Sequence, residues 1–191
     1  MLEDLIISKT RIKILNLFLG NPQKIYHVRE ITRRCDEEIN AVRRELAFLE
    51  KKSILRKEPR ANRVYYGLRM DYPFLSDLRT LWIKTGGLGG ALLKNRMKLG
   101  RLKFILMSGR FSHNLERDPE DVDLLVVGEV VLPELALLVR IEESRRGKEI
   151  NYTVMSDEEF IFRKKRNDPF VQKILSSSRV MIVGDEEELL K

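Results

Sequence analysis

The chain has 191 residues, of which 43% are hydrophobic and 34% are charged, and this composition predicts one or two small, well-solvated domains. No apolar run approaches the roughly 18 residues of a membrane span, and the single cysteine, Cys35, excludes an internal disulfide and a cysteine-cluster metal site. The first residues lack the long apolar core of a signal peptide, so we expect a mature, cytoplasmic protein.

The positive charge lies mainly in the first half of the chain. Residues 1–103 carry 23 Lys and Arg against 11 Asp and Glu, whereas residues 104–191 carry 13 against 18, and the whole chain has a net charge of +7. This asymmetry predicts a basic module that meets a polyanion and a second module that does not. A basic face that is merely solvated gives the same counts, so composition alone leaves nucleic-acid binding undecided.

The apolar pattern of the first 70 residues predicts three helices and then a hairpin. The helices are expected over residues 6–19, 26–34 and 37–52. Gly20-Asn21-Pro22 ends the first, and Asp36 is expected as a turn or N-cap residue before the third. Two strands, 54–58 and 63–68, enclose a basic tip.

Three helices followed by a basic hairpin is the order of a winged helix-turn-helix, which residues 8–70 resemble. The resemblance rests on the segment EITRRCDEEINAVRRELAFLEKKSILRKEPRANRVYYGL. It implies that residues 1–70 form a DNA-binding domain whose partner is double-stranded DNA. RNA is the alternative partner, because some winged helices bind it.

The exposed face of the third helix is expected to enter the major groove, where side chains meet base edges. We expect Asn40, Arg43 and Arg44 to make these contacts. Contacts to phosphates or to the minor groove are expected from the hairpin residues Arg56, Lys57, Arg60 and Arg63. Contacts to backbone phosphates are expected from the second-helix residues Arg29, Arg33 and Arg34. Taken singly, each of these basic residues is better explained as a solvated surface cation, and only the set as a whole favours DNA binding.

Residues 71–100 are expected to be linker helices. A helix follows Pro73, the segment Gly86-Gly87-Leu88-Gly89-Gly90 breaks or caps it, and helical character resumes over 91–99. The glycines lack the Lys-Ser/Thr of a phosphate-binding loop. The apolar stripe of the joining helix predicts a homodimer surface.

Asp121 and Asp123 stand two residues apart before the apolar run Leu124–Val127. In a strand such residues share a face, and two carboxylates on one face are oxygen ligands for Mg²⁺, the ion that organises nucleotidyl transfer. An earlier apolar strand, Phe104–Met107, ends just before Gly109, and a glycine there lets the backbone approach a phosphate.

The rest of the chain alternates strands and helices. Strands are expected over 102–107, 122–127, 149–154 and 180–183, with helices over 132–145, 157–165 and 169–176. The predicted fold class is therefore α/β (α+β), with a mixed sheet flanked by helices. Residues 101–191 resemble the minimal nucleotidyltransferase-like (polymerase-beta-like) family in the spacing from Gly109 to Asp121-Val122-Asp123.

The resemblance implies a nucleotide-binding turn at Gly109 and Arg110, and catalytic, metal-binding roles for Asp121 and Asp123. Two departures argue against activity: Arg110 replaces the family's serine, and Asn151 replaces its third carboxylate. Asn is neutral and cannot act as a base. Arg110 either pairs with one of the aspartates in place of a metal or grips a nucleotide phosphate. We therefore expect a degenerate domain, in which Mg²⁺ is needed only if the site is active.

The sequence thus predicts a dimeric, DNA-binding transcriptional regulator whose second domain is a pseudoenzyme used for sensing or assembly, with a nucleotide as a candidate ligand. Two alternatives stay open. One is an active Mg²⁺-dependent nucleotidyltransferase that modifies a small molecule, a protein or RNA. The other is an antitoxin-like binding module.

Overall fold

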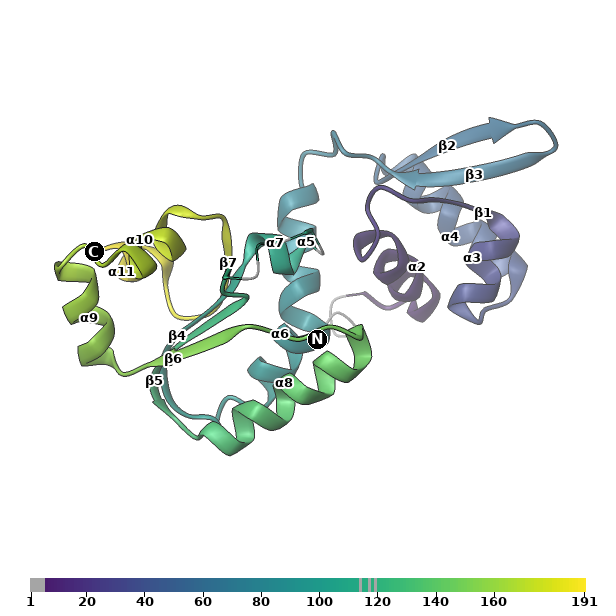
Figure 1. Cartoon of the computed structure of the whole chain (residues 1–191). Coiled ribbons are helices and arrows are strands. Elements are labelled where there is room, and N and C mark those ends of the chain that lie inside the picture. The colour runs from purple at the N-terminus through teal and green to yellow at the C-terminus, as the bar shows by residue number, and fades with distance from the viewer. Residues whose placement is uncertain (1–5, 114, 117, 119) are drawn as a thin grey trace. The chain divides into compact units, whose positions relative to one another are not determined.

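The structure is a computed structural model that describes residues 6–113, 115–116, 118 and 120–191 (Figure 1). The fold is mixed α+β, with helices and two separate sheets, as the sequence predicts. Its contacts divide the chain into two compact units, Met1–Trp82 and Ile83–Lys191. Among the described residues, no helix has the length and apolar character needed to cross a membrane.

In the described residues from 6 to 70, the first unit contains three helices and a three-stranded antiparallel sheet, which is the expected order of helices and hairpin. Its elements in chain order are α2 (Lys9–Leu19), β1 (Ile25–His27), α3 (Val28–Cys35), α4 (Ile39–Lys51), β2 (Leu55–Arg60) and β3 (Arg63–Leu68). The strand order is β1-β3-β2, so β3 is central and the hairpin of β2 and β3 forms the wing.

A single apolar core holds these elements together. Its buried side chains come from all three helices and both hairpin strands, and include Phe18, Ile31, Leu46, Leu49, Leu55 and Leu68. Leu75 at the start of α5 (Leu75–Thr85) joins the same cluster. The burial of this periodic apolar set is what orients the polar face of α4 outwards.

The start of α3 differs from the prediction, because residues 25–27 form a strand. Tyr26 is paired with Tyr66 and its ring packs edge-on against Phe18. The helix begins only after His27, whose Nδ1 accepts the Glu30 N–H at 3.2 Å. A strand of three residues is too short to show an alternating pattern, so the apolar pattern predicts a helix over these residues as well.

The turn between α3 and α4 is built from two acidic residues with different tasks. Asp36 ends α3 in the left-handed conformation, with φ of 49°, so it is the turn residue. Glu38 is the N-cap of α4, and its carboxylate accepts the N–H groups of Asn40 and Ala41 at 2.8 and 3.0 Å.

The second unit is a four-stranded mixed sheet with helices on both faces (Figure 1). Its elements in chain order are α6 (Gly87–Lys94), β4 (Gly100–Ser108), α7 (Gly109–Ser112), β5 (Leu124–Val130), α8 (Leu132–Arg146), β6 (Tyr152–Met155), α9 (Asp157–Lys165), α10 (Pro169–Ser176), β7 (Arg179–Val183) and α11 (Glu186–Leu190). The strand order is β6-β5-β4-β7. Of the strand pairs in the described residues of this unit, β5 and β6 are parallel and the others are antiparallel, and α8 makes the crossover between β5 and β6.

The helices α9, α10 and α11 cover one face of this sheet. Phe160, Val171 and Leu189 from these helices pack on Phe104 and Leu125 of the central strands. The side chains of β4 that point to the other face, such as Ile105 and Met107, are also fully buried, so the central strands are apolar on both sides.

The glycine segment 86–90 is only partly an interruption. Gly86 separates α5 from α6, but the following glycines form the first turns of α6 itself. A Cβ on Gly89 would collide with the carbonyl oxygen of Ile83, and one on Gly90 would lie 2.6 Å from that of Thr85. These glycines therefore allow the end of α5 and the start of α6 to approach closely.

Candidate functional site

The exposed face of α4 carries the residues expected to read DNA. Val42, Leu46 and Leu49 are buried, and the exposed residues Asn40, Arg43, Arg44, Ala47 and Lys51 recur at helical spacing on the opposite face. The donors Asn40 N–H and Ala41 N–H lower the pKa of Glu38, as do the nearby charges of Arg44 and Arg43. Glu38 therefore caps the helix as a carboxylate and lies close enough to Arg43 and Arg44 to feel their charge.

A groove of about 750 Å³ runs between the starts of α3 and α4 and the wing. Four cations line it, each from a different element: Arg29 of α3, Arg43 of α4, Lys57 of β2 and Arg63 of β3. Among the described residues that line it there is no carboxylate. The groove is therefore a concave, positively charged surface of the kind that attracts a polyanion.

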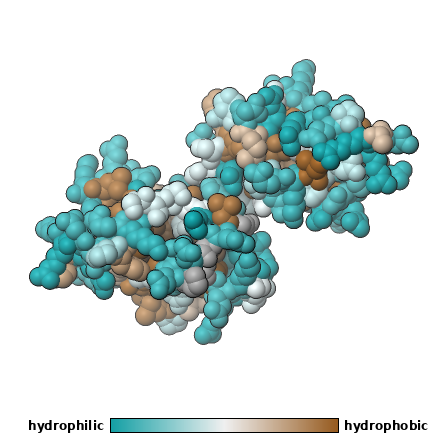
Figure 2. All heavy atoms as spheres, turned by 45° about the horizontal axis from the view of Figure 1, so that its top comes forward, coloured by the Kyte–Doolittle hydropathy of each residue, from teal (hydrophilic) through white to brown (hydrophobic). Residues whose placement is uncertain are grey.

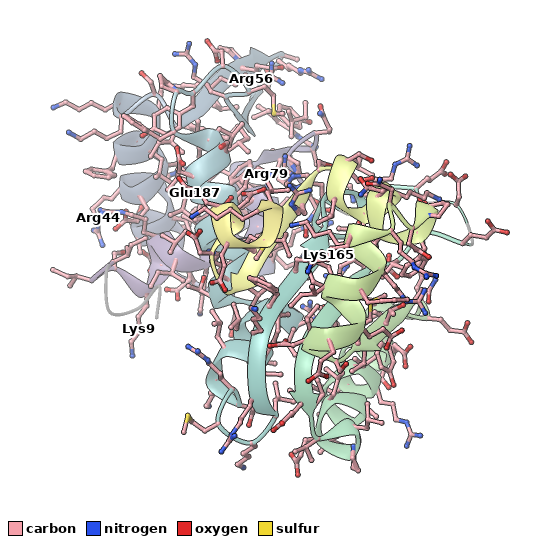
Figure 3. All side chains as sticks on the ribbon, turned by 90° about the vertical axis from the view of Figure 1, so that its left-hand side faces the viewer. Lys9, Arg44, Arg56, Arg79, Lys165 and Glu187 are labelled. Carbon is pink, nitrogen blue, oxygen red and sulfur yellow. The ribbon has the colours of Figure 1, made fainter. Side chains whose placement is uncertain are left out.

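The ten residues predicted to bind DNA are all exposed. Figure 3 shows two of them, Arg44 on α4 and Arg56 on β2, on the outside of the first unit. They differ in their ion pairs. Arg34 pairs with Glu30 at 2.8 Å, and Glu58 pairs with both Arg56 and Arg60 at 3.3 and 2.7 Å.

Within the described part of the chain, no ion pair is formed by the cations Arg29, Arg33, Arg43, Arg44, Lys57 and Arg63. Arg56 and Arg60 share one face of the wing with Glu58 by strand alternation, whereas Lys57 points to the opposite face and lines the groove. The uncompensated charge of the wing is therefore on the groove side.

His27 lies in this groove and was not among the predicted contact residues. Because its Nδ1 accepts the Glu30 N–H, the neutral ring carries its proton on Nε2, and its ring packs edge-on against Tyr65. His27 could not be assigned to the groove from the sequence, because the groove depends on the distant residues Lys57 and Arg63 of the wing, which no local pattern connects to it.

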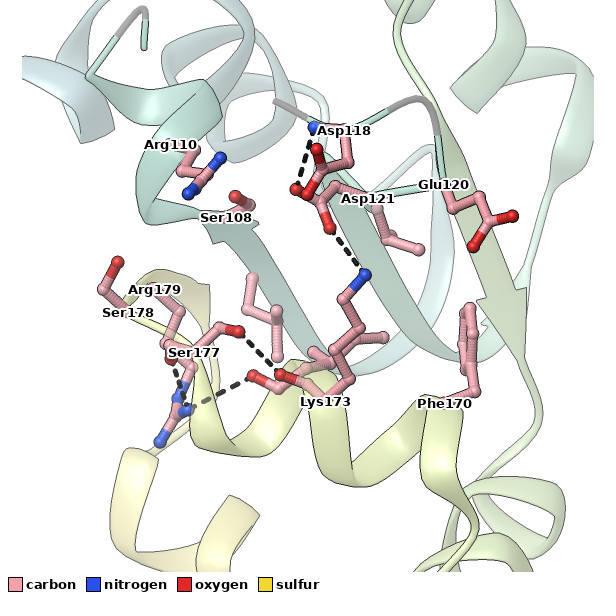
Figure 4. Close-up of a pocket in the computed structure, with 13 residues that line it drawn as sticks. Ser108, Arg110, Asp118, Glu120, Asp121, Phe170, Lys173, Ser177, Ser178 and Arg179 are labelled. Atoms are coloured by element: carbon pink, nitrogen blue, oxygen red, sulfur yellow. Dashed lines mark hydrogen bonds and ion pairs between the residues drawn. The ribbon is translucent and has the colours of Figure 1, made fainter. Parts of the chain in front are cut away.

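The second unit holds a cavity of about 310 Å³ that is lined by the end of β4, by Asp118 and residues 120–122, and by α10 (Figure 4). Its polar lining includes Ser108, Arg110, Asp121 and Lys173. Lys173 Nζ lies 2.8 Å from Asp121 Oδ1, and the Asp118 N–H donates to Asp121 Oδ2 at 3.2 Å. The hydrogen bond from Lys173 holds the pKa of Asp121 below its usual value.

Asp123 points elsewhere. It is 1% exposed and does not line the cavity. Its Oδ2 accepts the Asn151 N–H at 2.9 Å, and its own N–H donates to the Asn151 carbonyl at 2.7 Å. The strand β5 begins at Leu124 rather than at residue 122, so the two aspartates precede it and do not face a common space.

This geometry does not fit a Mg²⁺ site. Among the described residues there is no group of three or more His, Cys, Asp or Glu side chains that could hold a metal ion. Asn151, which stands where the sequence resemblance implies a third carboxylate, donates its Nδ2–H to the Asp121 carbonyl at 3.0 Å. A carboxylate has no such donor at neutral pH, so Asn151 fits the present hydrogen bonds better than an aspartate would.

Gly109 and Arg110, the predicted nucleotide-binding turn, both have partners within the chain. The Gly109 N–H donates to the Ser178 carbonyl at 2.7 Å, and Ser178 Oγ fills the space that a Cβ on Gly109 would need. Arg110 lines the cavity and its Nη1 donates to the Glu116 carbonyl at 3.1 Å. Asp121 pairs with Lys173, a residue that the sequence pattern did not single out.

A scan against protein-family models finds no match, and a search of curated proteins finds none either. Among solved structures, the chain is similar to reduced HlyU from Vibrio cholerae N16961, with 23% sequence identity and a TM-score of 0.33. The match covers 42% of this chain and 84% of HlyU. This likeness is too weak to assign a family.

Proposed function

We propose that residues 1–70 bind double-stranded DNA as a winged helix-turn-helix and that the protein is a transcriptional regulator. The observation that carries this proposal is the groove between α3, α4 and the wing, in which four cations from four elements converge without an acidic residue among its described lining. Cations that serve only to solvate a surface are not expected to concentrate in one groove.

The recognition surface is the exposed face of α4. Asn40, Arg43 and Arg44 lie in its first turns, where they meet base edges if the helix enters the major groove. Asn and Arg are the side chains that make paired hydrogen bonds to adenine and guanine, respectively. These three residues therefore supply sequence specificity in the proposed complex.

Affinity comes from contacts to the phosphates. Lys57 and Arg63 of the wing and Arg29 of α3 line the groove beside the recognition face, and Arg33 and Arg34 follow on α3. The paired residues Arg56 and Arg60 keep part of their charge for the nucleic acid, because one carboxylate, Glu58, serves both. A homodimer would place two recognition helices about 34 Å apart on a palindromic site.

For the second part of the chain we propose a degenerate nucleotidyltransferase-like domain that serves in ligand sensing or assembly. The mixed sheet with helices on both faces, together with the motif positions Gly109, Asp121 and Asp123, supports the family likeness. Loss of the serine at Arg110 and of the carboxylate at Asn151 supports an inactive site. The cavity beside Asp121 is of a size for a small-molecule ligand.

The experiment selects bound fragments from random DNA and then measures affinity for the enriched site by fluorescence anisotropy. The double variant Arg43→Ala/Arg44→Ala should bind that site at least about tenfold more weakly. The matched control, Lys148→Ala/Lys165→Ala, removes two exposed cations of the second unit and should keep wild-type affinity. Equal affinity of wild type and the arginine variant would refute the assignment, and preferred binding of an RNA of the same sequence would replace DNA by RNA.

A further inference from the structure

Lys173 is the residue of the cavity whose surroundings need an explanation. It lies on α10, whose first turn is fixed by the N-cap Asp168. Its ammonium group pairs with Asp121, and Figure 4 shows the side chain extending from α10 across the cavity to that carboxylate. The hydrogen bond and charge of Asp121, with smaller contributions from Asp118 and Glu120, raise the pKa of Lys173.

The ammonium group of Lys173 contacts the Asp121 carboxylate, whose oxygens a divalent ion would also need as ligands. Mg²⁺ and Mn²⁺ bind to carboxylate oxygens that are free of competing donors and converge on one point. Here Oδ1 of Asp121 faces Lys173, and Oδ2 accepts the Asp118 N–H. The other motif carboxylate, Asp123, is turned towards the start of β6. A compact ammonium with unit charge therefore occupies the site where such an ion would contact Asp121.

We propose that Lys173 is an internal cation that takes the place of a divalent metal beside Asp121 and ties α10 to Asp121. Ligand binding in the cavity then does not depend on a metal ion. Any ligand is held by the side chains of the cavity and not through a bridging ion. This inference concerns the second unit alone and does not depend on DNA binding by the first.

The ammonium group of Lys173 can exclude a metal ion because it extends from α10 to Asp121. The side chain of Lys173 is 56% exposed and that of Asp121 is 15% exposed, so the pair lies at the mouth of the cavity. A partly exposed pair adds little to stability. Its main effect is therefore on which cation can approach Asp121, which a binding experiment can measure directly.

The test measures Mn²⁺ binding to the full-length protein by electron paramagnetic resonance, in which free Mn²⁺ gives the signal and bound Mn²⁺ loses it. Wild type should show no saturable binding in the millimolar range. Lys173→Met removes the ammonium but keeps most of the side-chain volume, and it should bind Mn²⁺ at least about tenfold more tightly than wild type, because the Coulomb repulsion is gone. Asp121→Asn in the Lys173→Met background should abolish the gain.

Two control variants separate this effect from a general change of charge. Lys165→Met removes one exposed cation from α9 of the same unit and should leave Mn²⁺ binding as in wild type. Lys173→Arg keeps a cation at the site and should also exclude Mn²⁺. Saturable Mn²⁺ binding by wild type, or a Lys173→Met variant that gains none, would overturn the proposal.

The wild-type protein supplies a second measurement in case Lys173→Met does not fold. Its thermal midpoint Tm should be the same in millimolar Mn²⁺ as in a Ca²⁺- and Mn²⁺-free buffer of equal ionic strength, because an ion that does not bind the native state cannot stabilise it. A rise in Tm that Asp121→Asn removes would show that Asp121 takes a metal in spite of Lys173, and would overturn the proposal independently.

Discussion

Asp123 and Asn151 bind one another twice, through the Asn151 N–H on Asp123 Oδ2 and through the Asp123 N–H on the Asn151 carbonyl. This pair joins the residue before β5 to the residue before β6, the two strands that run parallel. The Leu124 N–H also donates to the Asn151 carbonyl, at 3.3 Å. Asp123 thus fixes the start of the parallel register, which is a structural task.

Asn151→Asp should destabilise the second unit. The substitution removes the donor to the Asp121 carbonyl and adds a third negative charge beside two aspartates. We expect a loss of about 1–3 kcal/mol in the free energy of unfolding, measured by urea denaturation. The loss should be larger at pH 7 than at pH 4, because the new carboxylate repels its neighbours only when ionised. Asn167→Asp, an exposed position, is the control, and an equal effect there would contradict this account.

Glu142 on α8 is a buried carboxylate, 4% exposed, that binds Arg145 Nη2 at 2.6 Å and Arg146 Nε at 2.7 Å. Glu142→Gln removes its charge and should cost about 1–3 kcal/mol of unfolding free energy, because the three charge-assisted hydrogen bonds from Arg145 and Arg146 are weakened. Chemical denaturation at neutral pH measures the loss. Glu134→Gln, in the first turn of the same helix, should change stability far less.

The pH dependence of stability follows from the same residue. Burial acts to raise the pKa of Glu142, but the hydrogen bonds from Arg145 and Arg146 outweigh it and hold the pKa below its usual value. A lowered native-state pKa means that the stabilisation is complete above the unfolded-state pKa and is lost as the pH falls through the native-state pKa. Wild type should therefore lose stability in acid below about pH 4.3, and Glu142→Gln should lose less over the same range.

Gly109→Ala should disturb the end of β4. The added Cβ would collide with Ser178 Oγ, and Ser178 Cβ and its carbonyl oxygen each lie 2.9 Å from the same point. We expect a destabilisation of about 1–3 kcal/mol. Combining it with Ser178→Gly should restore part of the loss, because the side-chain collision is removed while the contact with the carbonyl stays. A double variant as unstable as the sum of the single ones would show that the two positions do not interact.

Binding of the proposed DNA partner should depend on salt in a way that reports the groove cations. Each phosphate contact contributes about −0.9 to the slope of log K against log salt concentration. Lys57→Ala/Arg63→Ala should therefore make the slope less steep by about 1.8, and weaken binding to specific and random DNA alike. The measurement is anisotropy over a salt titration. An unchanged slope would place the phosphate contacts elsewhere.

Periodicity was sufficient to predict the elements of the first unit that are long and amphipathic. The helix α4 follows from Val42, Leu46 and Leu49, and the wing follows from its two strands around a basic tip. The three residues of β1 could not be found in this way, because Tyr26 is a strand residue only through its partner Tyr66 in β3.

The second unit shows the limit of local patterns at a site. The spacing of Asp121 and Asp123 predicted that both lie at the start of one strand and share a face. In the structure the strand β5 begins only at Leu124, so both aspartates precede it, and Asp123 is hydrogen-bonded to Asn151. No local sequence pattern pointed to Lys173 as part of the site. Its partner Asp121 lies 52 residues earlier in the chain, and only the packing of α10 brings the two together.

The surface gives a similar lesson. On the face shown in Figure 2 the exposed side chains are mostly hydrophilic, so hydropathy alone does not single out a binding site. The groove of the first unit is distinguished by the absence of acids among its described lining residues. This absence can be seen only once the fold is known. The sequence predicted the cations individually, and the structure brought four of them to one surface.

The strand order β6-β5-β4-β7 has a consequence for how the protein is made. Strand β4 is paired on one side with β5, which follows it closely, and on the other with β7, which leaves the ribosome some seventy residues later. Until then one edge of the apolar strand β4 has no partner in the sheet, and such an edge can pair with another chain. The first unit, whose contacts are all encoded before residue 83, is complete well before that interval begins. During synthesis the first unit can therefore fold while the sheet of the second unit is still incomplete. The exposed edge of β4 is the part that a chaperone would need to protect, and a pause in translation would prolong its exposure.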